Sequence, residues 1–393
     1  SVVLGSATPS LEAYYRAGKG EYRMFQLTRR LTGGELPTVY TVDLRQELQE
    51  GNRSIFSRKL QELMADRLNK GQQTILFLNR RGYAGFVSCR SCGEVMKCPH
   101  CDVSLSEHKG GRLICHYCGY TQPMPKLCPK CGSKYILGFK AGTQQIEEKL
   151  KELYPGVRTL RMDADTTRTK DSYEKILSSF ANGEADVLIG TQMIVKGHDF
   201  PKVTLVGILA ADLSLNASDY RAGERTFQLL TQAVGRAGRG VLPGEAVIQT
   251  YQPDHYAITC AAAQDYESFY QEEILYRELS GYPPVAHMLA VQIYGKEEEN
   301  VKQLALRLTD VVKSNMDFLS GKQKEQSNKK IQVLGPAPAN ISKINDIYRY
   351  VFYVKHAEYD VLVEVKDRLE ETLRQWQSRQ MSIQFDFDPV SVL

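Results

Sequence analysis

Short apolar runs alternate with amphipathic stretches along residues 1–280. The continuous runs predict strands buried on both faces, at residues 73–78, 158–163, 186–192 and 203–208. Apolar residues that recur with the helical period predict helices at residues 57–68, 144–153 and 173–180. Strands and helices that alternate at this spacing predict a parallel sheet with helices on both faces.

The first residues follow the same pattern. Residues 1–5 form a short apolar run, and small hydroxyl residues and then Leu11 follow it, which predicts a buried parallel strand leading into a helix. Such a strand needs neighbours on both sides. We therefore expect the upstream part of this unit to be missing or supplied separately.

The pattern changes after Pro284. We expect strands at residues 286–294, 331–334, 348–355 and 381–386, helices at 297–315 and 359–378, and a charged loop at 321–330. The order βαββαβ predicts a small two-layer α+β domain.

Basic and aromatic residues are interleaved in the middle of this last unit. They are Lys329, Lys330, Lys343, Arg349 and Lys355, with Tyr348, Tyr350 and Tyr353. They could form a stacking and phosphate-binding surface for single-stranded DNA. Equally, aromatic residues that alternate along a strand are typical of a buried core.

Composition changes this picture little. The chain is 42% hydrophobic and 24% charged with a net charge of +4, which predicts a folded protein of two or three units. The longest nearly apolar run, residues 203–211, is shorter than the roughly 20 residues of a membrane span. We expect a cytoplasmic protein with no membrane partner.

Eight of the nine cysteines form four pairs, each with two residues between its members. The pairs are Cys89 and Cys92, Cys98 and Cys101, Cys115 and Cys118, and Cys128 and Cys131. This spacing lets two thiolates share one tetrahedral zinc ion. Disulfides and a redox dithiol are the alternatives, but cytosolic thiols stay reduced. The sequence therefore predicts two structural Zn²⁺ ions.

The segment between the second and third pairs indicates which pairs share a metal. Residues 103–106 and 112–114 flank a Lys-Gly-Gly turn and predict a β-hairpin, which brings its two ends together. The outer pairs should then hold one zinc, with ligands Cys89, Cys92, Cys128 and Cys131. The inner pairs should hold the other, with ligands Cys98, Cys101, Cys115 and Cys118. We expect His100, His108 and His116 to face solvent or lie beside the sites, and Cys260 to be a small buried hydrophobe.

Two stretches downstream combine glycine with arginine or lysine. They are Gly-Thr-Gln-Met-Ile-Val-Lys-Gly-His-Asp-Phe at 190–200 and Gln-Ala-Val-Gly-Arg-Ala-Gly-Arg-Gly at 232–240. They resemble motifs V and VI of superfamily 2 nucleic-acid motors, and Gly-Ser-Ala-Thr at 5–8 resembles motif III. Gly-Arg pairs alone also occur in solvated loops, but the order of these motifs favours the motor.

The resemblance implies roles for individual residues. Arg239 is the candidate arginine finger, Arg236 lies beside it at the nucleotide, and Gln232 orients phosphates or water, because phosphoryl transfer needs positioning and cationic charge. Gly197 and Asp199 are further candidates at the nucleotide. The candidate DNA contacts are Gly190, Thr191, Gln192, Lys196, Gly142, Thr143, Arg80 and Arg81. Small residues among them would let the chain approach a phosphate closely.

Further residues narrow the resemblance. They are Asn-Arg-Arg-Gly-Tyr at 79–83 just before the cysteines, Gly142-Thr143 before a helix with Glu147, and Ala-Gly-Glu-Arg at 222–225. With the cysteine insertion, this set resembles the bacterial primosomal replication-restart helicases over essentially the whole chain. The resemblance implies an ATP-dependent 3′→5′ DNA helicase that recognises stalled forks and assembles the restart primosome. Implied partners are forked and single-stranded DNA, single-strand DNA-binding protein and helicase-loading proteins, at replication forks on the nucleoid.

The chain departs from that pattern in one respect. A Gly-x-x-x-x-Gly-Lys-Ser/Thr phosphate loop and an acidic Mg²⁺ box do not occur in the sequence. We therefore expect ATP and Mg²⁺ to bind only with a missing N-terminal lobe, and this chain alone to be inactive as an ATPase. The alternatives are a non-catalytic, zinc-dependent scaffold that binds DNA and loads proteins, and a zinc-ribbon factor of transcription or RNA metabolism.

These expectations combine into one architecture: an α/β RecA-like helicase lobe with an inserted two-zinc cysteine module, plus a small α+β C-terminal domain. Residues 1–35 would end helicase lobe 1, residues 36–84 and 138–280 would form lobe 2, residues 85–137 the zinc insertion and residues 281–393 the C-terminal domain. We expect the zinc insertion to be closed at its base by Cys89 and Cys131 and to project from the lobe.

Overall fold

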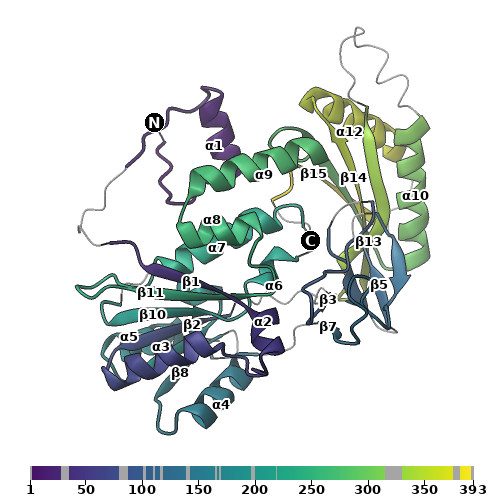
Figure 1. The fold of residues 1–393 in the computed structure, drawn as a ribbon. Helices are drawn as coiled ribbons and strands as arrows, with labels where there is room; N and C mark the ends of the chain where they lie inside the picture. The colour runs from purple at the N-terminus through teal and green to yellow at the C-terminus, as the bar shows by residue number, and fades with distance from the viewer. Residues whose placement is uncertain are drawn as a thin grey trace.

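The fold comes from a computed structural model of the chain (Figure 1). It describes residues 2–27, 35–78, 87–100, 103–108, 111–115, 118–138, 142–163, 166–167, 170–195, 200–217, 219–314, 330–374 and 381–390. Three units are present within these residues: a motor lobe, a cysteine module and a C-terminal domain.

A six-stranded parallel sheet forms the centre of the motor lobe. Its order is β1-β11-β10-β2-β9-β8. The strands are β1 (Thr38–Asp43), β2 (Gln73–Phe77), β8 (Thr159–Met162), β9 (Val187–Gly190), β10 (Val203–Ile208) and β11 (Glu245–Thr250). The four predicted strands and the parallel sheet are confirmed. The sequence pattern missed β1, a partly exposed edge strand, and β11.

Helices cover both faces of this sheet. One face carries α3 (Arg58–Asn69) and α4 (Thr143–Leu153), and the other carries α5 (Lys170–Ala181), α7 (Ala222–Val234), α8 (Tyr256–Ala263) and α9 (Tyr266–Ser280). Alternation along β10 explains this, because Leu205 packs toward α3 and Val206 toward α7. Figure 1 shows α3 and α4 on one side of the sheet and α7 and α8 on the other.

The predicted strand at the start of the chain is wrong. Residues 2–5 have no regular structure, and Val2, Val3 and Leu4 are 88%, 90% and 76% exposed. No described strand lies beside them, and a parallel strand is stable only between neighbours that accept and donate its hydrogen bonds. The predicted helix does follow: α1 (Leu11–Gly18) begins after Ser10, whose Oγ accepts a hydrogen bond from the amide of Ala13.

The cysteine module contains two small antiparallel sheets. Strands β3 (Val87–Cys89) and β7 (Ile136–Gly138) pair at its base, which closes the module as expected. Strands β4 (Ser106–His108), β5 (Arg112–Ile114) and β6 (Thr121–Pro123) form the second sheet. The predicted hairpin is β4 with β5, and β6 extends it.

The C-terminal domain has the predicted βαββαβ order. Its elements are β12 (His287–Gly295), α10 (Glu298–Ser314), β13 (Gln332–Ile344), β14 (Ile347–His356), α12 (Tyr359–Arg374) and β15 (Met381–Phe387). The antiparallel sheet has the order β13-β14-β12-β15. Strand β13 is longer than predicted, since it continues through Pro336 and Pro338 with two register shifts. As an edge strand it tolerates proline.

The four-stranded sheet is covered on both faces. Along β14, Phe352 and Val354 pack against α10 and α12, whereas Val351 and Tyr353 pack against the cysteine module. Figure 1 shows the module beside β13 and β14. The module therefore does not stand free beside the lobe, because the apolar second face of this sheet packs against it.

Candidate metal and nucleic-acid sites

The outer cysteine pairs converge on one point. Each Sγ atom of Cys89, Cys92, Cys128 and Cys131 lies within 4.8 Å of the others. The Sγ atoms of Cys89 and Cys131 are 3.6 Å apart, as are those of Cys92 and Cys128. A disulfide needs about 2.05 Å, whereas a tetrahedral zinc with Zn–S bonds of about 2.3 Å separates its sulfurs by roughly 3.8 Å. The donor set fits one zinc ion.

The inner pairs form a second cluster. The Sγ atoms of Cys98, Cys115 and Cys118 lie within 4.8 Å of one another, and those of Cys98 and Cys118 are 3.5 Å apart. Cys101 lies outside the described residues. The structure thus groups the thiols in the nested way that the hairpin predicts, outer with outer and inner with inner.

Tight turns aim the thiols of each pair at one point. Gly93, Gly119 and Gly132 follow the second cysteine of three pairs, with φ of 77°, 78° and 70°. The amide of Gly93 donates to the carbonyl of Cys89 over 2.8 Å. Burial disfavours the Cys89 thiolate, but the amides of Cys92 and Ser91 donate toward its sulfur, and its pKa falls to about 7. Burial and the neighbouring thiols raise the pKa of Cys92 in the same turn, so the backbone amides stabilise one thiolate of the cluster over the others.

Replacing Gly93 with alanine should destabilise the chain more than the same change at Gly132. Both positions have a left-handed backbone, which costs alanine about 1–2 kcal/mol. A Cβ at Gly93 would lie 2.5 Å from the carbonyl oxygen of Tyr251, while a Cβ at Gly132 meets nothing within 4 Å. We expect a further loss of about 1–3 kcal/mol for Gly93→Ala. The free energy of unfolding in urea measures it, and equal losses would contradict the packing argument.

The neighbouring histidines lie beside the clusters. His100 is exposed, and its ring packs edge-on against Tyr120. His108 is half-buried, and burial lowers its pKa. His116 lies outside the described residues. Cys260 is half-buried against the core of the motor lobe, so the expected full burial is only partial.

Several candidate DNA contacts meet at the carboxyl edge of the motor sheet. Gly142 precedes the first residue of α4, and the Thr143 Oγ1 donates to Asp163 Oδ2 over 2.6 Å at the end of β8. The Thr191 amide donates to the Met162 carbonyl, which places the end of β9 beside them. Gln192 begins a short 3₁₀ turn and is partly exposed. Arg80, Arg81 and Lys196 lie outside the described residues.

Gly190 is packed tightly inside the motor lobe. The residue is buried, and a Cβ there would lie 2.7 Å from Ile194 Cγ2 and 2.8 Å from the Met162 carbonyl oxygen. Its small size is therefore required by packing inside the lobe, and its expected contact with a DNA phosphate stays a prediction. Thr191 keeps a partly exposed side chain.

Gln232, Arg236 and Arg239, the described candidates for the nucleotide site, lie at the end of α7 and in the loop after it. Gln232 Nε2 is 3.5 Å from Thr8 Oγ1, which joins the 232–240 segment to the 5–8 segment. The exposed Arg239 donates from Nε to the Gly235 carbonyl over 2.8 Å, and Arg236 is partly buried. Gly197 and Asp199 lie outside the described residues. The Gly238 amide donates to the Val203 carbonyl, which places the loop after α7 near the amino end of β10.

Known protein families match each of the three units of the chain. Three family models match: Primosomal protein N C-terminal domain at residues 278–390, PriA DNA helicase Cys-rich region (CRR) domain at 98–123 and Helicase conserved C-terminal domain at 127–241. Replication restart protein PriA of Bacillus subtilis (strain 168) is 44% identical over 100% of the chain. The same-named protein of Synechocystis sp. is 40% identical over 100% of the chain. The chain belongs to the PriA family.

The match covers part of each relative. The alignment spans 48% of the Bacillus PriA and 46% of the Synechocystis PriA, so the chain spans about half the length of the curated relatives it matches. The three matched domains correspond to the motor lobe, the cysteine module and the C-terminal domain of the fold.

The structure decides between the two interpretations of the C-terminal aromatic residues. Tyr350, Tyr353 and Lys355 are 9%, 1% and 5% exposed. Lys355 Nζ donates to the Ser280 carbonyl over 2.7 Å and lies 4.0 Å from the centre of the Tyr282 ring. The core interpretation is right for these three, because β14 is a central strand with both faces covered. The DNA-surface interpretation is wrong for them.

The remaining members of that set lie near the surface. Lys343 and Lys330 are exposed, while Tyr348 and Arg349 are partly exposed. The Lys343 ammonium lies 4.7 Å from the centre of the Tyr348 ring. Lys329 lies outside the described residues.

A buried ionic cluster between α1, α7 and α9 was not predicted from the sequence. Arg277 donates to Glu273 Oε1 over 2.7 Å, to Glu224 Oε2 over 3.2 Å and to the Pro283 carbonyl over 2.8 Å. The Leu11 amide donates to Glu224 Oε1 over 3.0 Å, which ties α1 to α7. The Ala-Gly-Glu-Arg resemblance pointed to Glu224, but its partner fifty-three positions away has no local signal.

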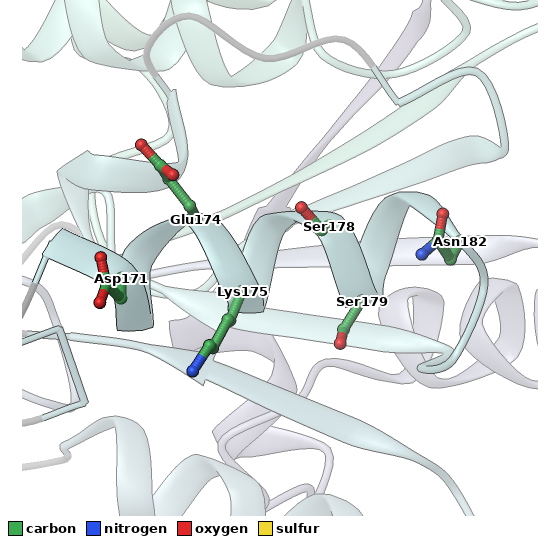
Figure 2. Close-up of a pocket in the computed structure, with 6 residues that line it drawn as sticks. All are labelled: Asp171, Glu174, Lys175, Ser178, Ser179 and Asn182. Carbon is green, nitrogen blue, oxygen red and sulfur yellow. The ribbon is translucent and has the colours of Figure 1, made fainter.

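A surface depression on the motor lobe carries no candidate chemistry. Figure 2 shows its lining residues, which come from α5 and the residue directly after it: Asp171, Glu174, Lys175, Ser178, Ser179 and Asn182. Their side chains spread along one helix and do not converge on a point.

Among the described residues, no helix is long and apolar enough to cross a bilayer.

Proposed function

We propose that the chain is the C-terminal part of an ATP-dependent 3′→5′ DNA helicase that recognises stalled replication forks and assembles the restart primosome. The observation that carries this is the contact of Gln232 with Thr8 on a lobe that also holds the cysteine module. The two motor-like segments are distant in sequence, and their contact supports a shared nucleotide site. Relatives of the same family carry the name replication restart protein PriA.

The two thiol clusters would each hold one structural Zn²⁺. The outer ion would have four cysteine ligands, and the inner ion three described cysteines with Cys101 as the fourth. Four thiolates leave no open coordination position for a substrate, so the zinc ions would stabilise the fold and take no part in hydrolysis. The contacts of Gly93 and Gly119 with neighbouring units support a structural role.

The nucleotide would bind against the end of α7. The exposed guanidinium of Arg239, which donates to the Gly235 carbonyl, would turn toward a γ-phosphate when nucleotide binds. There it would neutralise developing negative charge, with Arg236 and Gln232 beside it and Gly197 and Asp199 nearby. ATP and Mg²⁺ would need a phosphate loop from a longer chain, so we expect no ATP hydrolysis by these 393 residues alone.

Single-stranded DNA would lie along the carboxyl edge of the motor sheet. Thr191, Gln192 and Thr143 would position its phosphates, with Arg80, Arg81 and Lys196 supplying charge. Forked DNA, single-strand DNA-binding protein and primosome-loading proteins are the proposed partners.

An alternative is a non-catalytic, zinc-dependent scaffold that binds DNA and loads proteins. The packing of the cysteine module against both the motor lobe and the C-terminal domain favours this role as well. The two functions differ in whether they need Arg239.

Changing Arg239 to alanine separates these functions in a longer chain that carries the N-terminal half of the relatives. An arginine finger contributes on the order of 10³-fold or more to turnover. We expect DNA-stimulated ATP hydrolysis and unwinding to be lost while fork binding persists. Arg374→Ala, an exposed arginine on α12, is the control and should change neither. Intact unwinding by Arg239→Ala would contradict the finger role.

Binding of DNA to the chain itself should weaken steeply with salt. For a single strand, log K falls with log salt by about 0.7 for each phosphate neutralised. Thr191→Val should weaken binding by roughly five- to tenfold, the value of about one hydrogen bond, and leave the salt slope unchanged. Exposed Thr259 on α8 gives the control variant Thr259→Val. Fluorescence anisotropy across a salt series measures both, and a flat slope would favour protein docking.

A further inference from the structure

The outer thiol cluster lies against the motor lobe. Gly93, which follows Cys92, is buried, and a Cβ there would lie 2.5 Å from the Tyr251 carbonyl and 3.5 Å from Arg45 Cδ. The guanidinium of Arg90 lies 5.1 Å from the centre of the Tyr251 ring. Tyr251 directly follows β11, and Arg45 belongs to α2 (Leu44–Gln49). The turn that positions two outer thiols therefore also contacts the motor lobe.

The inner thiol cluster lies against the C-terminal sheet. Gly119, which follows Cys118, would place a Cβ 3.4 Å from the Pro336 carbonyl and 3.6 Å from Ala337 Cβ, both in β13. Cys98 and Cys115 are buried in the apolar cluster that contains Met288, Val351 and Tyr353 of the sheet. The turn that positions an inner thiol therefore contacts a different unit.

Each thiol cluster also has contacts beyond the unit against which its turn lies. Cys89 and Cys128 of the outer cluster also reach the shared apolar cluster. In addition, the Ser104 hydroxyl, close to the inner thiols in sequence, donates to the Asn216 carbonyl of the motor lobe in a short hydrogen bond. Loss of the inner metal would therefore leave the module attached to the motor lobe through the outer turn and Ser104.

We propose that the two metal sites have separate duties: the outer site anchors the module to the motor lobe, and the inner site holds the C-terminal sheet against the module. The inference rests on the proposed binding of zinc. A turn held by two metal-bound thiolates keeps its shape, whereas the same turn without metal loses the constraint. Losing the inner ion would then uncover the apolar face of β12 and β14 while the motor lobe keeps its contact.

Two single-ligand variants test this division. Cys118→Ser removes an inner ligand and Cys131→Ser an outer one, and both thiols are among the less buried of their clusters. Hydroxyl-radical footprinting with mass spectrometry reports side-chain exposure at Met288 and Tyr353, which are 0% and 1% exposed. We expect Cys118→Ser to raise their labelling on the order of tenfold by local opening, with labelling of Tyr251 unchanged. Cys131→Ser should raise labelling of Tyr251 and leave Met288 protected.

A variant that keeps all the thiols separates the contact from the metal. Ala337→Met places a larger side chain against Gly119 and should raise labelling of Met288 while two zinc ions stay bound. Ala305→Met, at a buried position on α10 against the opposite face of the sheet, is the control and should leave Met288 protected. Near-ultraviolet circular dichroism checks that each variant is folded.

The outcomes distinguish this inference from the proposed zinc sites. Purified chain without zinc would overturn both. Two zinc ions in the parent chain, with equal labelling changes in Cys118→Ser and Cys131→Ser, would overturn only the division of duties. Unchanged labelling of Met288 after loss of the inner ion would do the same.

Discussion

Chelating zinc from the purified chain is expected to unfold residues 87–138 and to lower the melting temperature of the whole chain. The five strands of the cysteine module are three residues long each, too short to form a stable sheet without cross-links. In structural sites of this kind, metal binding supplies about 10–16 kcal/mol of folding free energy at pH 7. A metallochromic dye should detect two zinc ions released per chain, and circular dichroism should follow the loss of structure.

The ninth cysteine supplies the control for this result. Cys260 lies on α8 and belongs to neither thiol cluster. Cys260→Ser should keep both zinc ions and the same response to chelator. A chain that melts at the same temperature with and without chelator would show that the thiol clusters stabilise nothing.

Changing Arg277 to methionine should cost the motor lobe about 3–5 kcal/mol, the usual loss when one partner of a buried ion pair is removed. Arg277 is fully buried between Glu224 and Glu273, which are 4% and 0% exposed. Methionine keeps the apolar length of the side chain but takes the cation from Glu273 and leaves Glu224 with only Arg221, 3.7 Å away. Urea denaturation measures the loss. Arg16→Met, which breaks an exposed pair with Glu21, should change stability by less than about 1 kcal/mol.

The loss of stability caused by Arg277→Met should be smaller at acidic pH than at neutral pH. Burial raises the pKa of Glu224 in the folded chain above its usual value. A carboxyl whose folded pKa is raised binds more protons folded than unfolded, so its contribution to stability falls as pH rises through that range. The loss of stability in Arg277→Met should therefore shrink at acidic pH, where protonation removes buried negative charge that the variant no longer neutralises in full. A deficit that grows on acidification would contradict this assignment.

Local patterns in the sequence were sufficient to predict much of the fold. Four of the six strands of the motor sheet and the βαββαβ order follow from apolar runs and periodicity. The nested grouping of the thiols follows from one hairpin between Cys101 and Cys115, because its strands fix which ends meet. These features depend on contacts between residues near each other in sequence.

Features that depend on distant contacts were missed. The apolar residues of β14 predict burial but do not say that the cysteine module covers one face, so the module was expected to project. The buried position of Gly190 depends on Met162 in a neighbouring strand. Residues 2–5 have the composition of a strand, but only neighbouring strands could make them one.

The edge strand β13 has a consequence for self-association. An exposed edge offers a row of free amides and carbonyls to which a strand from another molecule can pair. Pro336 and Pro338 have no amide hydrogen, and the two register shifts of β13 against β14 disturb the spacing of the remaining groups. This border of the C-terminal sheet is therefore a poor template for a further strand, which protects the chain against edge-to-edge aggregation.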